Sequence, residues 1–132
     1  MAVKTKRAKP KQYERQGQAL FFKRVWTDPR TKHLPIFAIP NGGSRNLIEA
    51  VNLKRSGVVK GVPDVFVAVA RGQWHGLFIE AKVRGNAASS EQQTMLDKLL
   101  AQGYRAAVAM GATPQALAEE MWDRLTYYLE NP

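Results

Sequence analysis

Two carboxylates and an ammonium group lie near one another in an otherwise apolar stretch of the chain. Asp64 opens the apolar run 65–69, and Glu80 and Lys82 follow a second apolar run that begins at Leu77. Charged groups in such a setting are costly to bury unless each has a partner. A divalent cation would neutralise the carboxylates, whose oxygens suit Mg²⁺. A lysine beside it could polarise a phosphate or orient an attacking water, so these residue types are those of metal-assisted phosphodiester hydrolysis.

Strand geometry can bring these three side chains together. Residues two apart in a strand share a face, so Phe78, Glu80 and Lys82 point one way and the residues between them point the other. The polar stretch between the two apolar runs contains Gly72, where the chain can fold back into an antiparallel hairpin. That hairpin places Asp64 close to Glu80 across the ladder.

The same residues also admit a structural interpretation. A Glu-x-Lys near the end of a strand is often a solvated edge, and an aspartate after a proline is often a turn residue. Taken alone, Glu80 and Lys82 do not decide between the two. The hairpin and the order in which Asp64, Glu80 and Lys82 occur favour a site.

With these motifs in that order, the chain resembles the PD-(D/E)xK nucleases. More narrowly, it resembles the virus-type replication-repair nuclease (VRR-NUC) domain in its short stand-alone phage and bacterial form. The resemblance extends over nearly the whole chain, from about Glu14 to Leu129. The motifs that carry it, in the family's order, are Glu14-x-x-x-Gln18, Ile39-Pro40-Asn41-Gly42-Gly43-x-Arg45, Leu53-Lys54-x-x-Gly57, Gly61-x-Pro63-Asp64, Gly76-Leu77-x-Ile79-Glu80-x-Lys82 and Ser89-x-x-Gln92.

The resemblance implies an α/β fold of the restriction-endonuclease-like type, with a mixed β-sheet flanked by helices. It also implies that Glu14, Asp64 and Glu80 surround one or two Mg²⁺ or Mn²⁺ ions, with the backbone carbonyl of Ala81 as a further ligand. Lys82 would orient or activate the attacking water and stabilise charge in the transition state. The resemblance gives a fifth residue, Gln92, the role of holding Lys82 or that water.

The function implied is that of a metal-dependent, structure-selective DNA endonuclease in replication, recombination or repair. Stand-alone members of the family resemble Holliday-junction resolvases, which act as homodimers because a four-way junction needs two symmetric incisions. The alternatives are a flap or general DNA nuclease of the same fold, an RNase, a non-catalytic nucleic-acid-binding module and a structural protein of a phage particle.

Composition agrees with a nucleic-acid partner and excludes several other classes. The 132 residues contain 20 Lys and Arg against 11 Asp and Glu, a net charge of +9. Five of the cations lie before residue 12, so the rest of the chain carries 20 − 5 − 11 = +4. A basic arm over residues 1–11, expected to be flexible, suits contact with phosphates, although a solubilising tail is an equal alternative. The remainder, residues 12–132, is long enough for a single domain.

Other classes of site and location are disfavoured. Cysteine is absent and His33 and His75 are far apart, so neither a disulfide framework nor a zinc site is expected. The sequence has no apolar run approaching the ~20 residues of a membrane span and no secretory signal. We therefore expect a cytoplasmic protein of a bacterium or a phage-infected cell.

Glutamine or glutamate residues stand at the heads of two otherwise apolar helical stripes. Over residues 12–26, Glu14 and Gln18 precede three apolar members of a helical stripe. A glutamate there could simply favour the helix dipole, but the resemblance places it in the metal site. Ser89-x-x-Gln92 is a capping-box pattern at the start of a helix that ends at Gly103, so Gln92 could serve as a cap, as a site residue, or as both.

Several further residues are candidates for contact with DNA. Asn41 and Gly42 form a turn after a short strand over 35–40, where the backbone could approach the scissile strand, and Arg45 follows them. Lys60 precedes the hairpin and Arg84 follows it, so both are also candidates.

The remaining elements complete the expected topology. A helix over 46–56 should bury Ala50 and Val51, residues 104–110 should form a strand, and Thr113 should cap the last helix. The expected order is therefore α-β-α-β-β-α-β-α.

Overall fold

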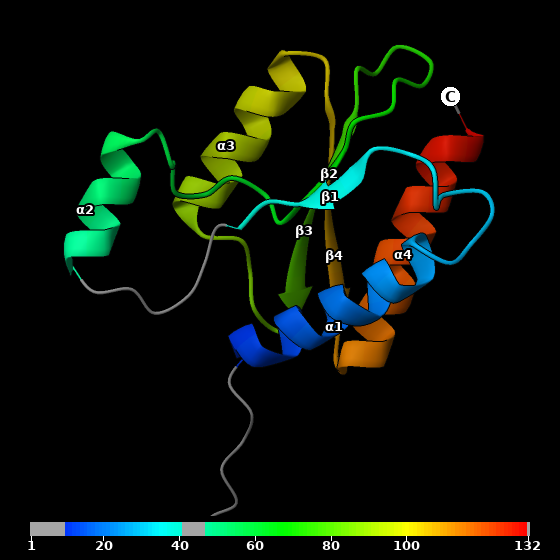
Figure 1. Ribbon diagram of the computed structural model, residues 1–132, viewed down its shortest axis with the longest axis horizontal. Helices are drawn as coiled ribbons and strands as arrows, with labels where there is room; N and C mark the ends of the chain where they lie inside the picture. The colour runs from blue at the N-terminus through cyan, green and yellow to red at the C-terminus, as the bar shows by residue number, and fades with distance from the viewer. Residues whose placement is uncertain (1–9, 41–46, 132) are drawn as a thin grey trace, which may run out of the picture.

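A computed structural model describes residues 10–40 and 47–131 of the chain (Figure 1). The elements follow the order α-β-α-β-β-α-β-α that the sequence predicts. Their bounds are α1 (Pro10–Val25), β1 (Ile36–Ala38), α2 (Leu47–Arg55), β2 (Val65–Val67), β3 (Leu77–Val83), α3 (Ser90–Ala101), β4 (Arg105–Gly111) and α4 (Pro114–Glu130).

The four strands form one mixed sheet in the order β1-β2-β3-β4. β2 pairs with β1 and β3 in antiparallel fashion, whereas β3 and β4 are parallel. A parallel pair needs a crossover connection, and α3 supplies it. The predicted hairpin is confirmed, and its register pairs Val65 with Ile79. Continuing that register by one residue brings Asp64 opposite Glu80.

Helices cover the sheet on both faces. α1 and α4 pack against each other and against β3 on one face, while α3 lies on the other and contacts β4 (Figure 1). The side chains that alternate along β3 divide accordingly, since Leu77, Ile79 and Ala81 belong to the main core. On the opposite face Phe78 stacks on Phe66 at a centroid distance of 4.4 Å. The largest fully buried side chains of the main core are Phe21, Leu77, Ile79, Leu117, Met121 and Leu125.

The start of α1 differs from the prediction. The helix begins at Pro10 rather than at residue 12, so Lys11 belongs to the helix and not to the basic arm. Proline is tolerated in the first turn because its missing N–H would have no intrahelical acceptor there. The first turn of α1 therefore carries a cation, Lys11, on the folded body of the protein.

The prediction for the second helix was correct in its existence and wrong in its packing. α2 ends before Gly57, whose φ of +97° is one that glycine adopts without strain. However, Ala50 is exposed, and the exposed fractions of Val51 and Ile48 are 41% and 73%. In Figure 1, α2 stands apart from the sheet, so its apolar residues have no core to face.

The last helix begins as the sequence predicts. The side chain of Thr113 accepts a hydrogen bond from the N–H of Ala116, and Pro114 is the first helical residue. Among the described residues, no helix is both long and apolar enough to cross a bilayer.

Candidate active site

The candidate site lies where β3 extends beyond the end of β2. The last pair between these strands is Val65 with Ile79, whereas β3 continues to Val83. Beyond that pair the N–H groups of Ala81 and Val83 have no strand to bond with on this side. Asp64 Oδ2 accepts a hydrogen bond from the N–H of Ala81 at 2.8 Å, and Glu14 Oε2 accepts one from the N–H of Val83 at 3.2 Å. Two of the predicted acidic residues therefore cap the free edge of β3 and are held in place by it.

Glu80 is the most deeply buried acidic residue of the site, with 3% of its surface exposed. Its Oε1 accepts a hydrogen bond from Gln92 Nε2 at 2.9 Å and lies 3.8 Å from Lys82 Nζ. Its Oε2 is buried and has no hydrogen-bond partner among the described residues. A buried carboxylate oxygen without a partner is energetically costly, so this atom is suited to a ligand.

Gln92 belongs to the site and to a helix cap at once. The backbone N–H of Ser89 donates to Gln92 Oε1 at 2.8 Å, and the N–H of Gln92 donates to Ser89 Oγ at 3.2 Å, which completes the predicted capping box. Because Oε1 is used in the cap, the amide nitrogen is the atom directed at Glu80. The expected partner was Lys82 or a water, and the partner observed is Glu80.

Burial disfavours the ionised forms of all three carboxyl groups, and the charge of Asp64 adds to this effect at Glu80 and Glu14. Burial and then the nearby charge of Asp64 raise the pKa of Glu80 to about 8, against the opposing charge of Lys82. Burial also raises the pKa of Asp64 and that of Glu14, although the backbone hydrogen bonds from Ala81 and Val83 oppose it. Raised carboxyl pKa values in a cleft are typical of functional sites.

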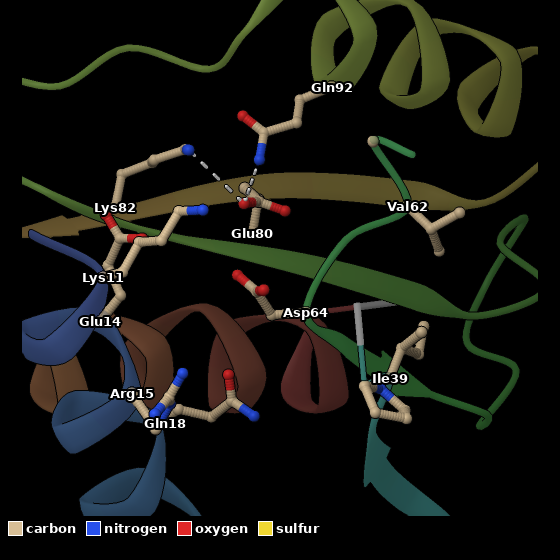
Figure 2. A pocket seen from close by; sticks show the side chains of 12 residues that line it. Lys11, Glu14, Arg15, Gln18, Ile39, Val62, Asp64, Glu80, Lys82 and Gln92 are labelled. Carbon is tan, nitrogen blue, oxygen red and sulfur yellow. Dashed lines mark hydrogen bonds and ion pairs between the residues drawn. The ribbon is translucent and has the colours of Figure 1, made fainter. Parts of the chain in front are cut away.

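These side chains line a pocket of about 430 Å³ (Figure 2). β3 contributes Glu80 and Lys82, α3 contributes Gln92, and Asp64 comes from the residue just before β2; the polar atoms of the four converge in Figure 2. α1 contributes a wall that includes Glu14, and the segments before β2 and after β1 contribute the rest.

A glycine allows the loop that carries Asp64 to lie against α3. Gly61 has φ of +89°, and a Cβ built on it would lie 2.6 Å from the carbonyl oxygen of Glu91. A side chain there would push the loop away from the first turn of α3, which holds Gln92. Gly61 therefore keeps Asp64 and Gln92 on opposite walls of one pocket.

The structure brings together all five residues predicted to act in catalysis: Glu14, Asp64, Glu80, Lys82 and Gln92.

The residues predicted to contact DNA are not among the described residues that line the pocket. Lys60 and Arg84 are exposed and do not line the pocket. Asn41, Gly42 and Arg45 lie outside the described residues.

Two cationic residues of the pocket were not singled out from the sequence as members of the site. Lys11 and Arg15 line the pocket from α1. Their spacing of four residues, on either side of Glu14, is the signal that could have identified them, because such residues share a helix face.

The described residues fit a divalent cation in part. Asp64 and Glu80 lie within hydrogen-bonding reach of each other, so either a shared proton or a cation can satisfy the pair and the buried Glu80 Oε2. Glu14 is occupied at Oε2 by the N–H of Val83. Consistent with this, the described part of the chain contains no group of three or more acidic, histidine or cysteine side chains already arranged around an ion. Two carboxylates are thus in place, and Glu14 could join them only through its other oxygen or by moving.

The sheet, its flanking helices and the Asp64, Glu80 and Lys82 arrangement define the PD-(D/E)xK class of nucleases. Residues 7–113 match the model of the VRR-NUC domain family, and the chain belongs to that family. Its fold is similar to the solved structure of a VRR_NUC domain protein, with a TM-score of 0.70 and 27% sequence identity over 89% of this chain and 88% of that one. No curated protein sequence gives a significant match. Membership of the family implies a nuclease with a DNA substrate and a divalent metal.

Proposed function

We propose that this protein is a Mg²⁺- or Mn²⁺-dependent DNA endonuclease that selects branched DNA and acts as a homodimer similar to a Holliday-junction resolvase. The observation that best supports it is the buried, unpartnered Oε2 of Glu80 beside Asp64 and Lys82. Two ionised carboxylates in this environment are unfavourable without a cation, whereas a bound cation makes their ionised forms favourable.

Asp64 and Glu80 would hold the cation, with Glu14 as a third carboxylate. The carbonyl of Ala81 is a further candidate, because the N–H and the C=O of one strand residue point to the same side, and its N–H points to Asp64. When bound, the cation supplies positive charge at a phosphate oxygen and lowers the pKa of the attacking water.

Lys82 is suited to the reacting phosphate. The side chain of Lys82 is only 14% exposed, and its Nζ lies beside Glu80 Oε1 within the pocket. From there Nζ can donate a hydrogen bond to the attacking water or to a phosphate oxygen, which stabilises negative charge in the transition state. Gln92 acts through Glu80 because it holds Oε1 and leaves Oε2 for the cation.

The experiment compares cleavage of labelled four-way junction, flap and linear duplex by purified protein with Mg²⁺ or Mn²⁺. Lys82→Ala is the test variant. Lys32→Ala, which removes an exposed lysine that does not line the pocket, is the matched control.

Each outcome tests a different part of the proposal. Paired symmetric nicks in the junction, lost in Lys82→Ala and kept in Lys32→Ala, are the expected result. Cutting of flaps but not of junctions would retain the nuclease and refute the resolvase. Binding of DNA without metal-dependent cleavage of any substrate would leave only a binding module.

A further inference from the structure

One face of α1 presents four polar side chains to the pocket. Lys11, Glu14, Arg15 and Gln18 all line it, and their spacing of i, i+3, i+4 and i+7 is that of one helix face (Figure 2). The same stripe continues along the helix as Phe21 and later apolar residues, which are buried. The polar part of the stripe is thus directed at the pocket by the packing of the apolar part.

Within the described part of the chain, the two cations of this face have no partner that would account for their position. Lys11 and Arg15 are exposed, and neither makes a hydrogen bond or an ion pair with a described residue. Lys11 favours the ionised form of Glu14, but this is the weakest of the influences on the pKa of that carboxyl, and burial outweighs it. Their charges are therefore available to a ligand in the pocket.

Two arginines elsewhere on the protein, Arg24 and Arg30, behave differently. Arg24, at the other end of α1, bonds Glu119 at 3.4 Å and lies 4.2 Å from the ring centroid of Trp122. Arg30 bonds Asp28 at 3.0 Å. Those cations are engaged in contacts within the fold, whereas the pair at the pocket end is not.

Lys11 and Arg15 decide the net charge of the side chains that line the pocket. The lining contains three cations (Lys11, Arg15 and Lys82) and three carboxylates (Glu14, Asp64 and Glu80), so the ionised groups sum to 3 − 3 = 0. Without Lys11 and Arg15 the sum would be 1 − 3 = −2. An anionic strand of DNA would be repelled by that negative pocket, and the two exposed cations neutralise it. With the divalent cation of the proposed function bound, the sums become 0 + 2 = +2 with the pair and −2 + 2 = 0 without it, so the pair is what makes the pocket attractive to DNA.

We propose that Lys11 and Arg15 bind the phosphate backbone of the nucleic-acid strand that is to be cut, next to the scissile phosphate. The proposal rests on the proposed function, since it takes the pocket as the place of cleavage. Side chains four residues apart on a helix have Cβ atoms roughly 5–6 Å apart, so their long stems can reach one phosphate together or two neighbouring ones. Arginine suits this role because its guanidinium can bond two phosphate oxygens at once.

The test compares two double variants that remove the same charge from different places. Lys11→Gln/Arg15→Gln removes the proposed contacts. Lys23→Gln/Lys32→Gln removes two exposed lysines that do not line the pocket, one of them on α1 itself. Glutamine keeps helix propensity close to that of lysine and arginine, and circular dichroism with thermal unfolding verifies that both variants are folded.

The first readout is the salt dependence of binding. Affinity for labelled four-way junction and duplex is measured by fluorescence anisotropy in EDTA over a series of salt concentrations. Each lost phosphate contact should reduce the slope of log affinity against log salt by about 0.9. We expect a reduction of roughly 1–2 for Lys11→Gln/Arg15→Gln and a clearly smaller one for the control.

The second readout is steady-state cleavage with Mg²⁺. A backbone contact beside the reacting phosphate binds substrate and transition state alike, so KM should rise by on the order of tenfold while kcat stays within about twofold. Equal effects of the two double variants on slope and KM would overturn the proposal, because they would reflect net charge alone.

The outcomes also separate this proposal from the proposed function. Wild-type cleavage with no difference between the variants overturns the phosphate contacts and keeps the nuclease. A reduced salt slope in Lys11→Gln/Arg15→Gln, together with a wild-type protein that cuts nothing, keeps the contacts and overturns the nuclease. Absence of DNA binding by the wild type overturns both.

Discussion

The first half of α1 lines the candidate site, whereas the second half of the same helix is buried in the core. In the first half Glu14 faces the pocket and is held by the backbone of β3. In the second half Phe21, Phe22 and Val25 are buried in the core. One helical stripe thus serves chemistry at one end and stability at the other, and the change from polar to apolar side chains marks the border between them.

The two halves also differ in their contribution to the free energy of folding. Each large apolar side chain fully buried in the second half contributes about 1.5–3 kcal/mol. Around the first half, burial raises the pKa of Glu14, Asp64 and Glu80, so their ionised forms oppose folding. The packed half therefore stabilises a site whose ionised form is itself unfavourable without a ligand.

The largest effect on activity is expected at the pocket end. Glu80→Gln keeps the shape of the side chain but removes the negative charge beside Asp64. We expect cleavage to fall on the order of 10³-fold, which corresponds to about 4 kcal/mol in the barrier, with no loss of thermal stability in the metal-free protein. Single-turnover cleavage and thermal unfolding measure the two. Unchanged cleavage would remove Glu80 from the active site.

The packed half should give the reverse pattern. Phe21→Ala deletes a ring that is 1% exposed and should lower the free energy of unfolding by about 3–5 kcal/mol. Urea unfolding measures this loss. At a temperature where the variant stays folded, its cleavage rate should remain within a few fold of wild type, and a loss comparable to that of Glu80→Gln would show that the two halves are not separable.

The stability of the metal-free protein should depend on pH through Glu80, at the pocket end of the comparison. The pKa of Glu80 is raised from 4.5 to about 8, so in the metal-free protein the folded state holds a proton that the unfolded state has lost. Its contribution to stability is fully present below pH 4.5 and is lost as the pH rises to about 8. Thermal unfolding from pH 5 to pH 8.5 should show this fall, and it should be much smaller in Glu80→Gln.

The same linkage predicts that metal affinity rises with pH over this range, because the ligands must be deprotonated. Isothermal titration calorimetry with Mn²⁺ tests it. A metal affinity that does not change between pH 6 and pH 8 would argue against Glu80 as a ligand.

The smallest effect is expected at the helix cap that supports Gln92. Ser89→Ala removes the acceptor of the Gln92 N–H and should cost about 1 kcal/mol of stability. The backbone N–H of Ser89 remains, so Gln92 keeps its second link to the cap. We expect metal affinity and cleavage to fall only a few fold, and Ser89→Thr, which can form the same cap, should restore both.

Much of this fold could be predicted from the sequence because its signals are local. The alternation along β3 separates core residues from Glu80 and Lys82, and the glycine-containing turn sets the hairpin register that brings Asp64 opposite Glu80. Ser89 and Thr113 begin their helices through short-range hydrogen bonds that neighbouring residues determine. Periods and caps of this kind depend on a few adjacent residues.

Other features depend on which elements have neighbours. The sequence predicts that α2 buries Ala50 and Val51, yet both are exposed because α2 stands apart from the sheet (Figure 1). Likewise, the pattern of Gln92 allows a cap or a site residue, and only the position of Glu80 decides that it is both.

The sequence by itself determined the elements, the hairpin and the residue types of the candidate site. Only the tertiary structure decided that Glu14 and Asp64 cap the free edge of β3, because that edge exists only where β2 ends and α1 crosses. It also placed Lys11 and Arg15 at the rim of the pocket. The physical reason is that hydrogen bonds and charges act between side chains distant in sequence, and packing alone sets those distances.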